Sequence, residues 1–241
     1  MLHTLGFCLV VMLGFLIEAT LGFGGTVVAL PLCSMIVGIR VAVPAITAVV
    51  CLASLAIVIE DRQYIAYRPY GIMMLFLLLG MPLGMKIYSS FPERPLKIIL
   101  GLFTVFVACK GLFYRQKAKE GAISPVYYLC LFLGGIIHGA FSCGGVLTVI
   151  YANRAVTEKR AYRVTLSAIW FSLNLVITIK NLITGAMGKE AIMLGCLSLP
   201  FVALAIVVGN VLIKRLRAES FVKWVYVMLF LSGALMFVQA L

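Results

Sequence analysis

Two ionisable side chains, each followed by a glycine pair, stand inside apolar segments of this sequence. Glu18 is the one charged residue in the stretch 4–39, and the pair Gly24–Gly25 follows it; His138 precedes Gly144–Gly145 in the same way. Ionisable residues in membrane segments usually mark substrate or proton pathways. Adjacent glycines let the chain turn and let a ligand approach the backbone closely. These residue types indicate proton and ligand transport, with Glu18 and His138 as the predicted proton-coupling residues.

The two groups recur at an offset of 120 residues. The stretch GFLIEATLGFGGTVVALP then lies on GGIIHGAFSCGGVLTVIY, and a further shift places PLKIILGLF on FVKWVYVML. The matches fall on glycines, charges and mid-span polar residues: Gly14 with Gly134, Glu18 with His138, Arg40 with Arg160, Ser54 with Asn174. We therefore predict one membrane domain of two pseudo-symmetric repeats, residues 1–116 and 121–241.

The composition places these repeats in a membrane. The chain has 241 residues, 63% hydrophobic and 12% charged, whereas soluble domains average about 45–50% apolar and roughly 25% charged. A helix needs about 20 apolar residues to cross the bilayer, and several charge-free runs approach or reach that length. They are Val41–Ile59, Pro69–Met85, Val164–Ile179, Ala191–Ile213 and Trp224–Leu241. The sequence predicts an all-α polytopic membrane protein whose surroundings are the lipid bilayer.

Other classes fit less well. The net charge of +12 follows the enrichment of Lys and Arg beside membrane spans, so no nucleic-acid partner is predicted. The seven cysteines form no C-x-x-C pair and resemble small core hydrophobes, so neither a metal site nor a cofactor is predicted. The N-terminus lacks the basic region of a signal peptide and is predicted to be a first membrane segment.

The two long apolar runs, 4–39 and 121–153, allow two topologies. If each crosses once, eight crossings divide Lys and Arg twelve to eight; if each folds back as a re-entrant hairpin, the division is fourteen to six. The second reading obeys the positive-inside rule better. It gives each half a glycine-broken first segment plus three transmembrane helices, which makes the repeats inverted and places both termini outside.

A helix that begins at each glycine pair would point unsatisfied N–H groups and a positive dipole end into the break. Such ends favour anions, and secondary transporters build their sites from such breaks near the midplane. We predict that both breaks cradle one small anion through Gly24, Gly25, Thr26, Ser142, Gly144 and Gly145. The alternative is that the glycines serve close helix packing.

The repeated glycine motif, with an arginine about fifteen residues on, resembles the TauE/SafE sulfite exporter family, also called the toluene-sulfonate uptake permease family, over nearly the whole chain. The resemblance implies a secondary transporter in the bacterial inner membrane. Its substrates would be sulfite, thiosulfate, sulfoacetate or organosulfonates. The second motif differs from the first because Tyr151 stands at the position that corresponds to Pro31. Assembly as a homodimer is an open alternative.

Several roles stay open on the sequence alone. Glu18 and His138 either carry protons or only hydrogen-bond a neighbouring helix. Arg40 and Arg160 either contact the substrate or anchor an interface, and Ser54 and Asn174 either join helices or face the ligand. We expect no enzyme activity, although an intramembrane serine hydrolase using His138 and Ser142 is an alternative, as is an anion channel.

Overall fold

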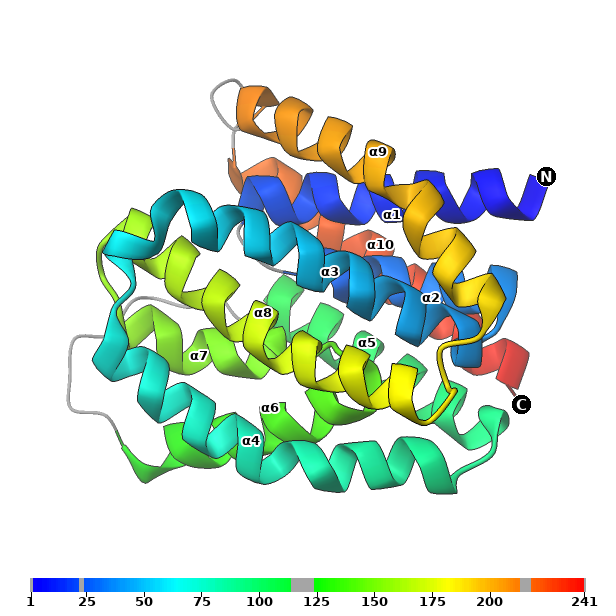
Figure 1. The fold of residues 1–241 in the computed structure, drawn as a ribbon, viewed down its shortest axis with the longest axis horizontal. Coiled ribbons are helices and arrows are strands. Elements are labelled where there is room, and N and C mark those ends of the chain that lie inside the picture. Colours follow the sequence, from blue (N-terminus) through cyan, green and yellow to red (C-terminus); the bar gives the residue numbers. More distant parts are fainter. Residues whose placement is uncertain (1, 22–23, 114–123, 213–217, 241) are drawn as a thin grey trace. The chain divides into compact units, whose positions relative to one another are not determined.

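A computed structural model describes residues 2–21, 24–113, 124–212 and 218–240, and the regular structure of these residues is entirely helical (Figure 1). This confirms the prediction of an all-α protein. In chain order the elements are α1 (Leu2–Leu21), α2 (Gly25–Val37), α3 (Ile39–Asp61), the 3-10 turn η1 (Arg62–Tyr64), α4 (Tyr67–Ser90), α5 (Glu93–Phe113), α6 (Pro125–Phe141), α7 (Gly145–Ala155), α8 (Lys159–Ile183), α9 (Lys189–Leu212) and α10 (Ala218–Ala240).

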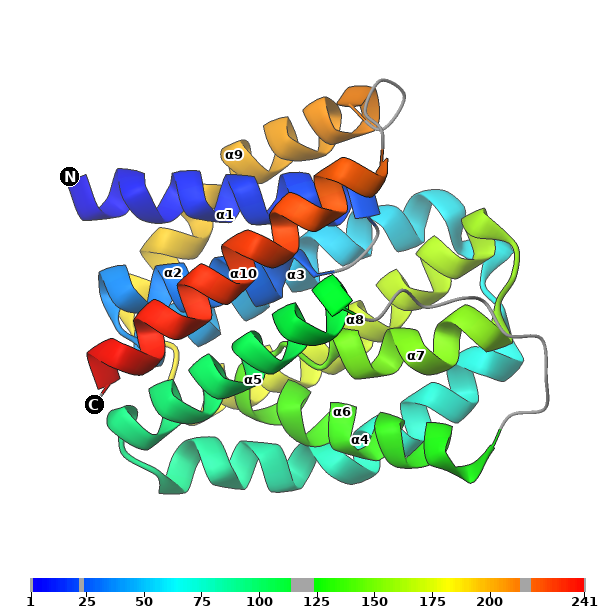
Figure 2. The same ribbon diagram turned by 180° about the vertical axis from the view of Figure 1, so that it is seen from behind.

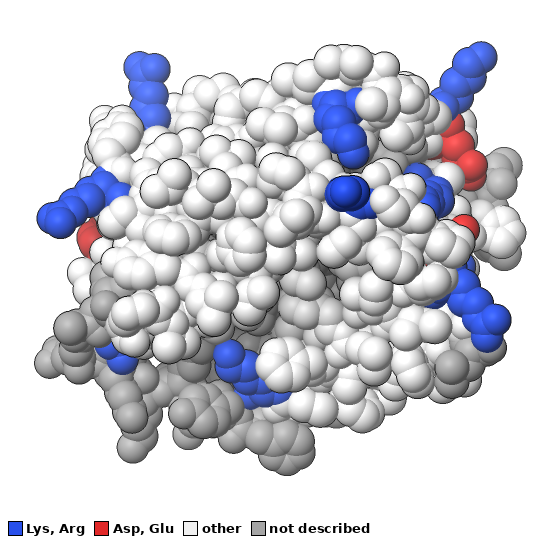
Figure 3. Space-filling view, turned by 90° about the horizontal axis from the view of Figure 1, so that it is seen from below, with Lys and Arg blue, Asp and Glu red and all other residues white. Residues whose placement is uncertain are grey.

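The helices have the length and the surface of a multi-pass membrane protein. Five of the described segments are long and apolar enough to cross a bilayer, namely Ile39–Tyr64, Tyr67–Ser90, Glu93–Leu112, Lys159–Ile183 and Lys189–Gly209. Large aliphatic side chains are exposed along them, including Leu75, Leu79 and Leu83 of α4. Figure 3 shows one face that is covered mostly by uncharged side chains. Such a surface suits lipid and not water.

The described residues form two compact units, and neither unit is one half of the sequence. Unit 1 comprises residues 1–46, 91–116 and 186–241, and unit 2 comprises 47–90 and 117–185. Unit 1 therefore combines α1, α2, α5, α9, α10 and the start of α3. Unit 2 combines the rest of α3 with α4, α6, α7 and α8.

Unit 1 is built on three extensive helix contacts. α5 packs along α10, as Figure 2 shows, and α1 packs along both α9 and α2. Small residues permit the close approach: a Cβ atom added at Gly101 of α5 would stand 3.0 Å from the carbonyl oxygen of Gly233 in α10, and one at Gly209 of α9 would stand 2.6 Å from the Cβ of Ala19. Small residues commonly bring membrane helices together in this way.

Unit 2 is organised around the pair α4 and α6. Each of these helices carries a small-xxx-small motif, Gly80–Gly84 and Gly135–Gly139, and the two motifs face each other. A Cβ atom at any of the four glycines would collide with a backbone carbonyl oxygen of the other helix. The glycines thus let the two backbones touch, as in other GxxxG contacts between membrane helices.

Both long apolar runs fold back on themselves. In unit 1, α2 runs antiparallel to α1: Gly25 lies beside Glu18, Ala29 beside Gly14, and the Cys33 thiol contacts the carbonyl oxygen of Phe7. In unit 2, α7 folds back on α6 and brings Gly144 and Leu147 against His138 and Gly134. Each long run is therefore a helical hairpin, in agreement with the folded-back reading of the sequence.

The same contacts recur in the two units. Gly25 packs on Gly14 and Glu18 of α1, whereas in unit 2 Gly144 packs on Gly134 and His138 of α6. These environments fit the proposed repeat. The repeat itself, its boundaries 1–116 and 121–241, and its inverted orientation stay predictions.

The folded-back hairpins have a testable consequence for topology. Within unit 1 the first residues of α1 and the last of α10 lie at one end, and α5 ends at the opposite end (Figures 1 and 2). Reporter fusions at Leu241 and near Lys119, both outside the described residues, are expected to report opposite sides of the membrane. Lys119 should be cytoplasmic because that side carries fourteen of the twenty basic residues. The same side for both fusions would contradict the hairpin topology.

Candidate functional site: two glycine elbows

The elbow between α1 and α2 depends on two glycines with different tasks. Gly24, the residue before α2, has φ 90°, a left-handed conformation that favours glycine. Gly25 lies directly against α1, where an added Cβ would collide with the carbonyl oxygen of Gly14 and stand 2.8 Å from the Cβ of Glu18. The first glycine therefore permits the turn, and the second permits the close contact of the two helices.

Glu18 faces the N-terminus of α2. Its carboxylate accepts hydrogen bonds from the backbone N–H and from the side chain of Thr26, the second residue of that helix. A carboxylate is favourable at this position because the first turn of a helix offers unsatisfied N–H groups and a positive dipole end. The Glu18 carboxylate thus occupies the N–H group of Thr26, which the sequence predicts to bind an anion. Anion binding by Gly24, Gly25 and Thr26 stays a prediction.

The elbow between α6 and α7 is built differently. Ser142, which ends α6, has φ 55° and donates its backbone N–H to the carbonyl oxygen of His138 at 2.7 Å. Its hydroxyl lies 2.6 Å from the hydroxyl of Thr47 in α3. Here Ser142 has the left-handed conformation, while Gly144 has φ −64°. Ser142 therefore makes the left-handed turn of this elbow.

Gly144 and Gly145 also have different structural roles. A Cβ at Gly144 would collide with the carbonyl oxygen of Gly134 and stand 2.7 Å from the Cβ of His138, whereas one at Gly145 would make an ordinary contact of 3.4 Å with the Trp170 ring. Gly144 is thus needed for the contact of α7 with α6. Gly25 has the corresponding contact in unit 1. The structure therefore matches Gly25 with Gly144, whereas the offset of 120 residues matches Gly25 with Gly145.

His138 sits in a buried cluster with two residues of α8. Its Nε2 atom lies 3.1 Å from Oδ1 of Asn174, and its ring stacks on the indole of Trp170 with a centroid distance of 5.6 Å and an interplanar angle of 16°. His138 is 1% exposed and Asn174 is 0% exposed. The elbow, the imidazole and a buried amide therefore meet within unit 2.

This cluster contains unsatisfied polar atoms. In the described residues four buried side-chain atoms lack a hydrogen-bond partner, and three of them belong to His138 (Nδ1), Asn174 (Nδ2) and Thr178 (Oγ1). The fourth is the hydroxyl of Ser34 in α2. A buried polar group without a partner costs about 1–3 kcal/mol. Three of the four atoms thus lie on His138 and on α8.

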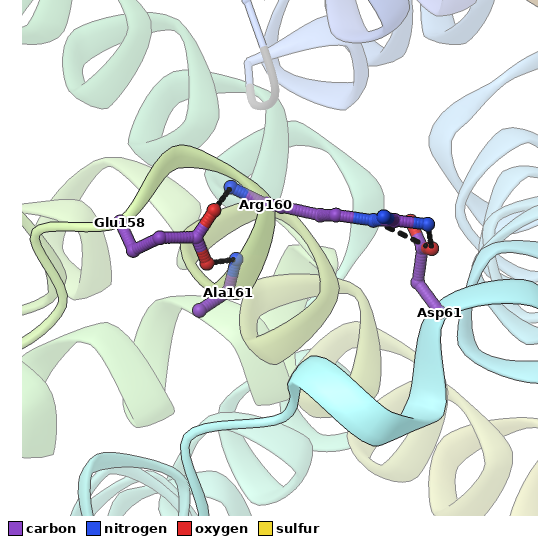
Figure 4. Close-up of polar contacts among 4 residues, drawn as sticks. All are labelled: Asp61, Glu158, Arg160 and Ala161. Carbon is purple, nitrogen blue, oxygen red and sulfur yellow. Dashed lines mark hydrogen bonds and ion pairs between the residues drawn. The ribbon is translucent and has the colours of Figure 1, made fainter.

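Arg160 has a partner of its own at the start of α8. It donates from Nε and Nη2 to Oδ1 of Asp61 at 2.9 and 2.6 Å (Figure 4). Its guanidinium also lies over the ring of Tyr64 at 4.0 Å. Next to it, the carboxylate of Glu158 caps α8 by accepting from the backbone N–H groups of Arg160 and Ala161 at 2.9 and 2.6 Å. Because the Arg160 side chain is half exposed, the geometry describes an interfacial ion pair.

Arg40 is held in a comparable way at the start of α3. It donates to the carbonyl oxygen of Phe91. The neighbouring Glu93 accepts a hydrogen bond from the backbone N–H of Ile39 at 3.2 Å and forms an ion pair with Lys97 at 2.8 Å. Both arginines thus tie a helix start to a neighbouring loop or helix end. Contact of Arg40 or Arg160 with a substrate stays a prediction.

Sequence reasoning found His138 and the glycines of this site but not Trp170, and it left Asn174 either joining helices by hydrogen bonds or facing the ligand. A signal was present, since Trp170 and Asn174 stand four residues apart and therefore share a face of α8. No group of three or more His, Cys, Asp or Glu side chains that could hold a metal occurs in the described part of the chain.

Comparison with known proteins gives one family. The family model described as sulfite exporter TauE/SafE matches residues 7–236, a range that begins within α1 and ends within α10. No curated protein and no solved structure matches the chain. Members of this family are membrane transporters, and the helices described above are those of a multi-pass membrane protein. The chain belongs to the sulfite exporter TauE/SafE family.

Proposed function

We propose that this protein is a secondary transporter that moves a small sulfur-containing oxyanion across the bacterial inner membrane in a process driven by protons. Sulfite, thiosulfate, sulfoacetate and organosulfonates are the substrate classes. Family membership supports anion export, while the identity of the anion, the coupling ion and alternating access are part of the proposal. Assembly as a homodimer stays a prediction.

The observation that carries the proposal is the contact between Glu18 and the N-terminus of α2. An ionisable side chain inside an apolar hairpin is expensive and usually functional. Here the Glu18 side chain accepts from the backbone N–H and the hydroxyl of Thr26. Protonation would remove the charge that these donors and the helix dipole favour. The protonation state of Glu18 therefore has a direct structural partner at the elbow, as a proton-coupled transporter requires.

Transport is also favoured over hydrolysis by the partners of Ser142 and His138. In a serine hydrolase the hydroxyl donates to the histidine base. Here the Ser142 hydroxyl pairs with Thr47, and Nε2 of His138 pairs with Asn174. Each group of the alternative dyad has another neighbour, so the geometry gives the hydrolase no support.

The test is a flux assay on the purified protein in liposomes. Radiolabelled sulfite, thiosulfate, sulfoacetate and methanesulfonate would be offered with and without an imposed pH gradient, and protein-free liposomes serve as the control. We expect at least one of these anions to accumulate when the pH gradient is present. Flux that follows the membrane potential but ignores the pH gradient would identify a channel, and no flux of any anion would overturn the proposal.

A further inference from the structure

We propose that His138 and Asn174 form an oxyanion-binding site within unit 2, beside the N-terminus of α7, and that the anion binds there together with one proton. This inference rests on the proposed function, because it names the residues that hold the transported anion. It assigns the binding role to a histidine and an amide instead of the arginines.

The first argument is the chemistry of the unpartnered atoms. The Oδ1 atom of Asn174 can only accept, so Nε2 of His138, 3.1 Å away, carries the proton of the neutral ring and donates it. The atoms that remain without a partner are Nδ1 of His138 and Nδ2 of Asn174. One is a proton acceptor and the other is a donor. Because Nε2 holds the Asn174 amide, Nδ1 faces the other side of the ring. A ligand at Nδ1 must supply an acidic proton, and a ligand at Nδ2 must supply an acceptor oxygen.

A singly protonated oxyanion such as hydrogen sulfite has both groups. Its O–H would donate to Nδ1 of His138, while Asn174 holds the ring through Nε2. An organosulfonate carries no proton at neutral pH, so it requires that Nδ1 be protonated first and then donate. Hydrogen sulfite on the neutral ring keeps one negative charge, whereas an organosulfonate on the protonated ring forms a complex without net charge. A proton that His138 takes up with the anion therefore avoids burying a net negative charge.

The second argument is the position of the cluster. Gly144 lies against His138, and the first residue of α7, Gly145, lies against the ring of Trp170. The imidazole thus stands beside the end of α7 whose N–H groups and dipole favour negative charge. The Trp170 indole stacks on the imidazole, and the face of an indole ring attracts a cation.

The third argument is that His138 is the group here that binds a proton. The amide and the indole of α8 do not titrate, and α7 contributes the backbone of Gly144. α4 packs one residue further along α6 through the backbone of Met81, and α3 contributes the hydroxyl of Thr47 to Ser142. These neighbours are all uncharged, so a proton that arrives with the anion resides on His138.

Binding measurements on purified protein test this site. Asn174→Asp retains the oxygen that accepts from His138 but replaces the free donor by a charged acceptor. We expect it to weaken binding of labelled sulfite and of methanesulfonate at least about tenfold, or roughly 1.4 kcal/mol. Asn181→Asp, the same exchange at another buried asparagine of α8, is the matched control and should bind both anions normally.

Proton uptake gives the second readout. Calorimetric titration of the wild-type protein with methanesulfonate in two buffers of different ionisation enthalpy should show proton uptake on binding, and His138→Gln should show none. This measurement requires only that the wild-type protein and the His138→Gln variant fold.

The outcomes separate the site from the function. Normal affinity in Asn174→Asp, or methanesulfonate binding by the wild type without proton uptake, would overturn the site while sulfite flux by the wild type still upholds the proposed function. A wild-type protein that neither binds nor transports these anions would overturn the function, and the site with it.

Discussion

Glu18→Gln is expected to reduce pH-driven accumulation of the transported anion to the level of protein-free liposomes. Glutamine cannot carry a proton, but its amide oxygen still accepts from Thr26, so the contact between α1 and α2 should survive. Equilibrium binding of sulfite to the purified variant should therefore be unchanged. The loss would concern the proton-driven transport step, and not the affinity for the anion or the proton that is proposed to bind with it at His138.

The matched control for this variant is Glu190→Gln. Glu190 is an exposed acid in the first turn of α9, and its neutralisation should leave pH-driven accumulation intact. Wild-type pH dependence in Glu18→Gln would reduce Glu18 to a structural hydrogen-bond acceptor at the elbow, and the source of proton coupling would have to be sought elsewhere.

Gly144→Ala is expected to destabilise the α6–α7 hairpin, whereas Gly145→Ala is expected to be tolerated. The added methyl group at Gly144 would collide with the backbone of Gly134, which can move only if the helices separate. Overpacking of this kind typically costs about 1–3 kcal/mol or more. At the adjacent position the same methyl group meets only the Trp170 ring at an ordinary distance.

Thermal unfolding of the two variants in detergent would measure this difference, and anion binding would be recorded on the same samples. Gly25→Ala should behave like Gly144→Ala, because Gly25 has the matched place against α1. Equal stability of Gly144→Ala and Gly145→Ala would contradict the packing described here. It would favour a role for both glycines in binding alone.

Much of the fold was predictable because membrane segments can be recognised from their composition. The charge-free runs became long helices, and the length of the stretch 4–39, too great for one span, indicated a folded-back segment. The order of the helices in space was not predictable in this way. That α9 packs on α1, and α4 on α6, follows from complementary small residues such as Gly209 and Ala19, whose pairing depends on tertiary contacts.

The candidate site was predicted only in outline. Sliding the sequence on itself placed Gly24–Gly25 on Gly144–Gly145, but the contacts match Gly25 with Gly144. A fixed offset could not reveal this shift, because the left-handed turn is made by a glycine in one elbow and by Ser142 in the other. The functions of Asn174 and Trp170 depend on how α8 faces α6, which the periodicity of either helix alone does not determine.

Coupling between the movement of the anion and the movement of protons can be tested most directly inside liposomes that contain the purified protein and a trapped pH indicator. A gradient of sulfite or methanesulfonate, imposed at equal starting pH with the membrane potential clamped, is predicted to change the internal pH in the wild type and not in Glu18→Gln. Methanesulfonate is the stricter probe because it brings no proton of its own. Labelled methanesulfonate that crosses the membrane while the internal pH stays constant would contradict the account.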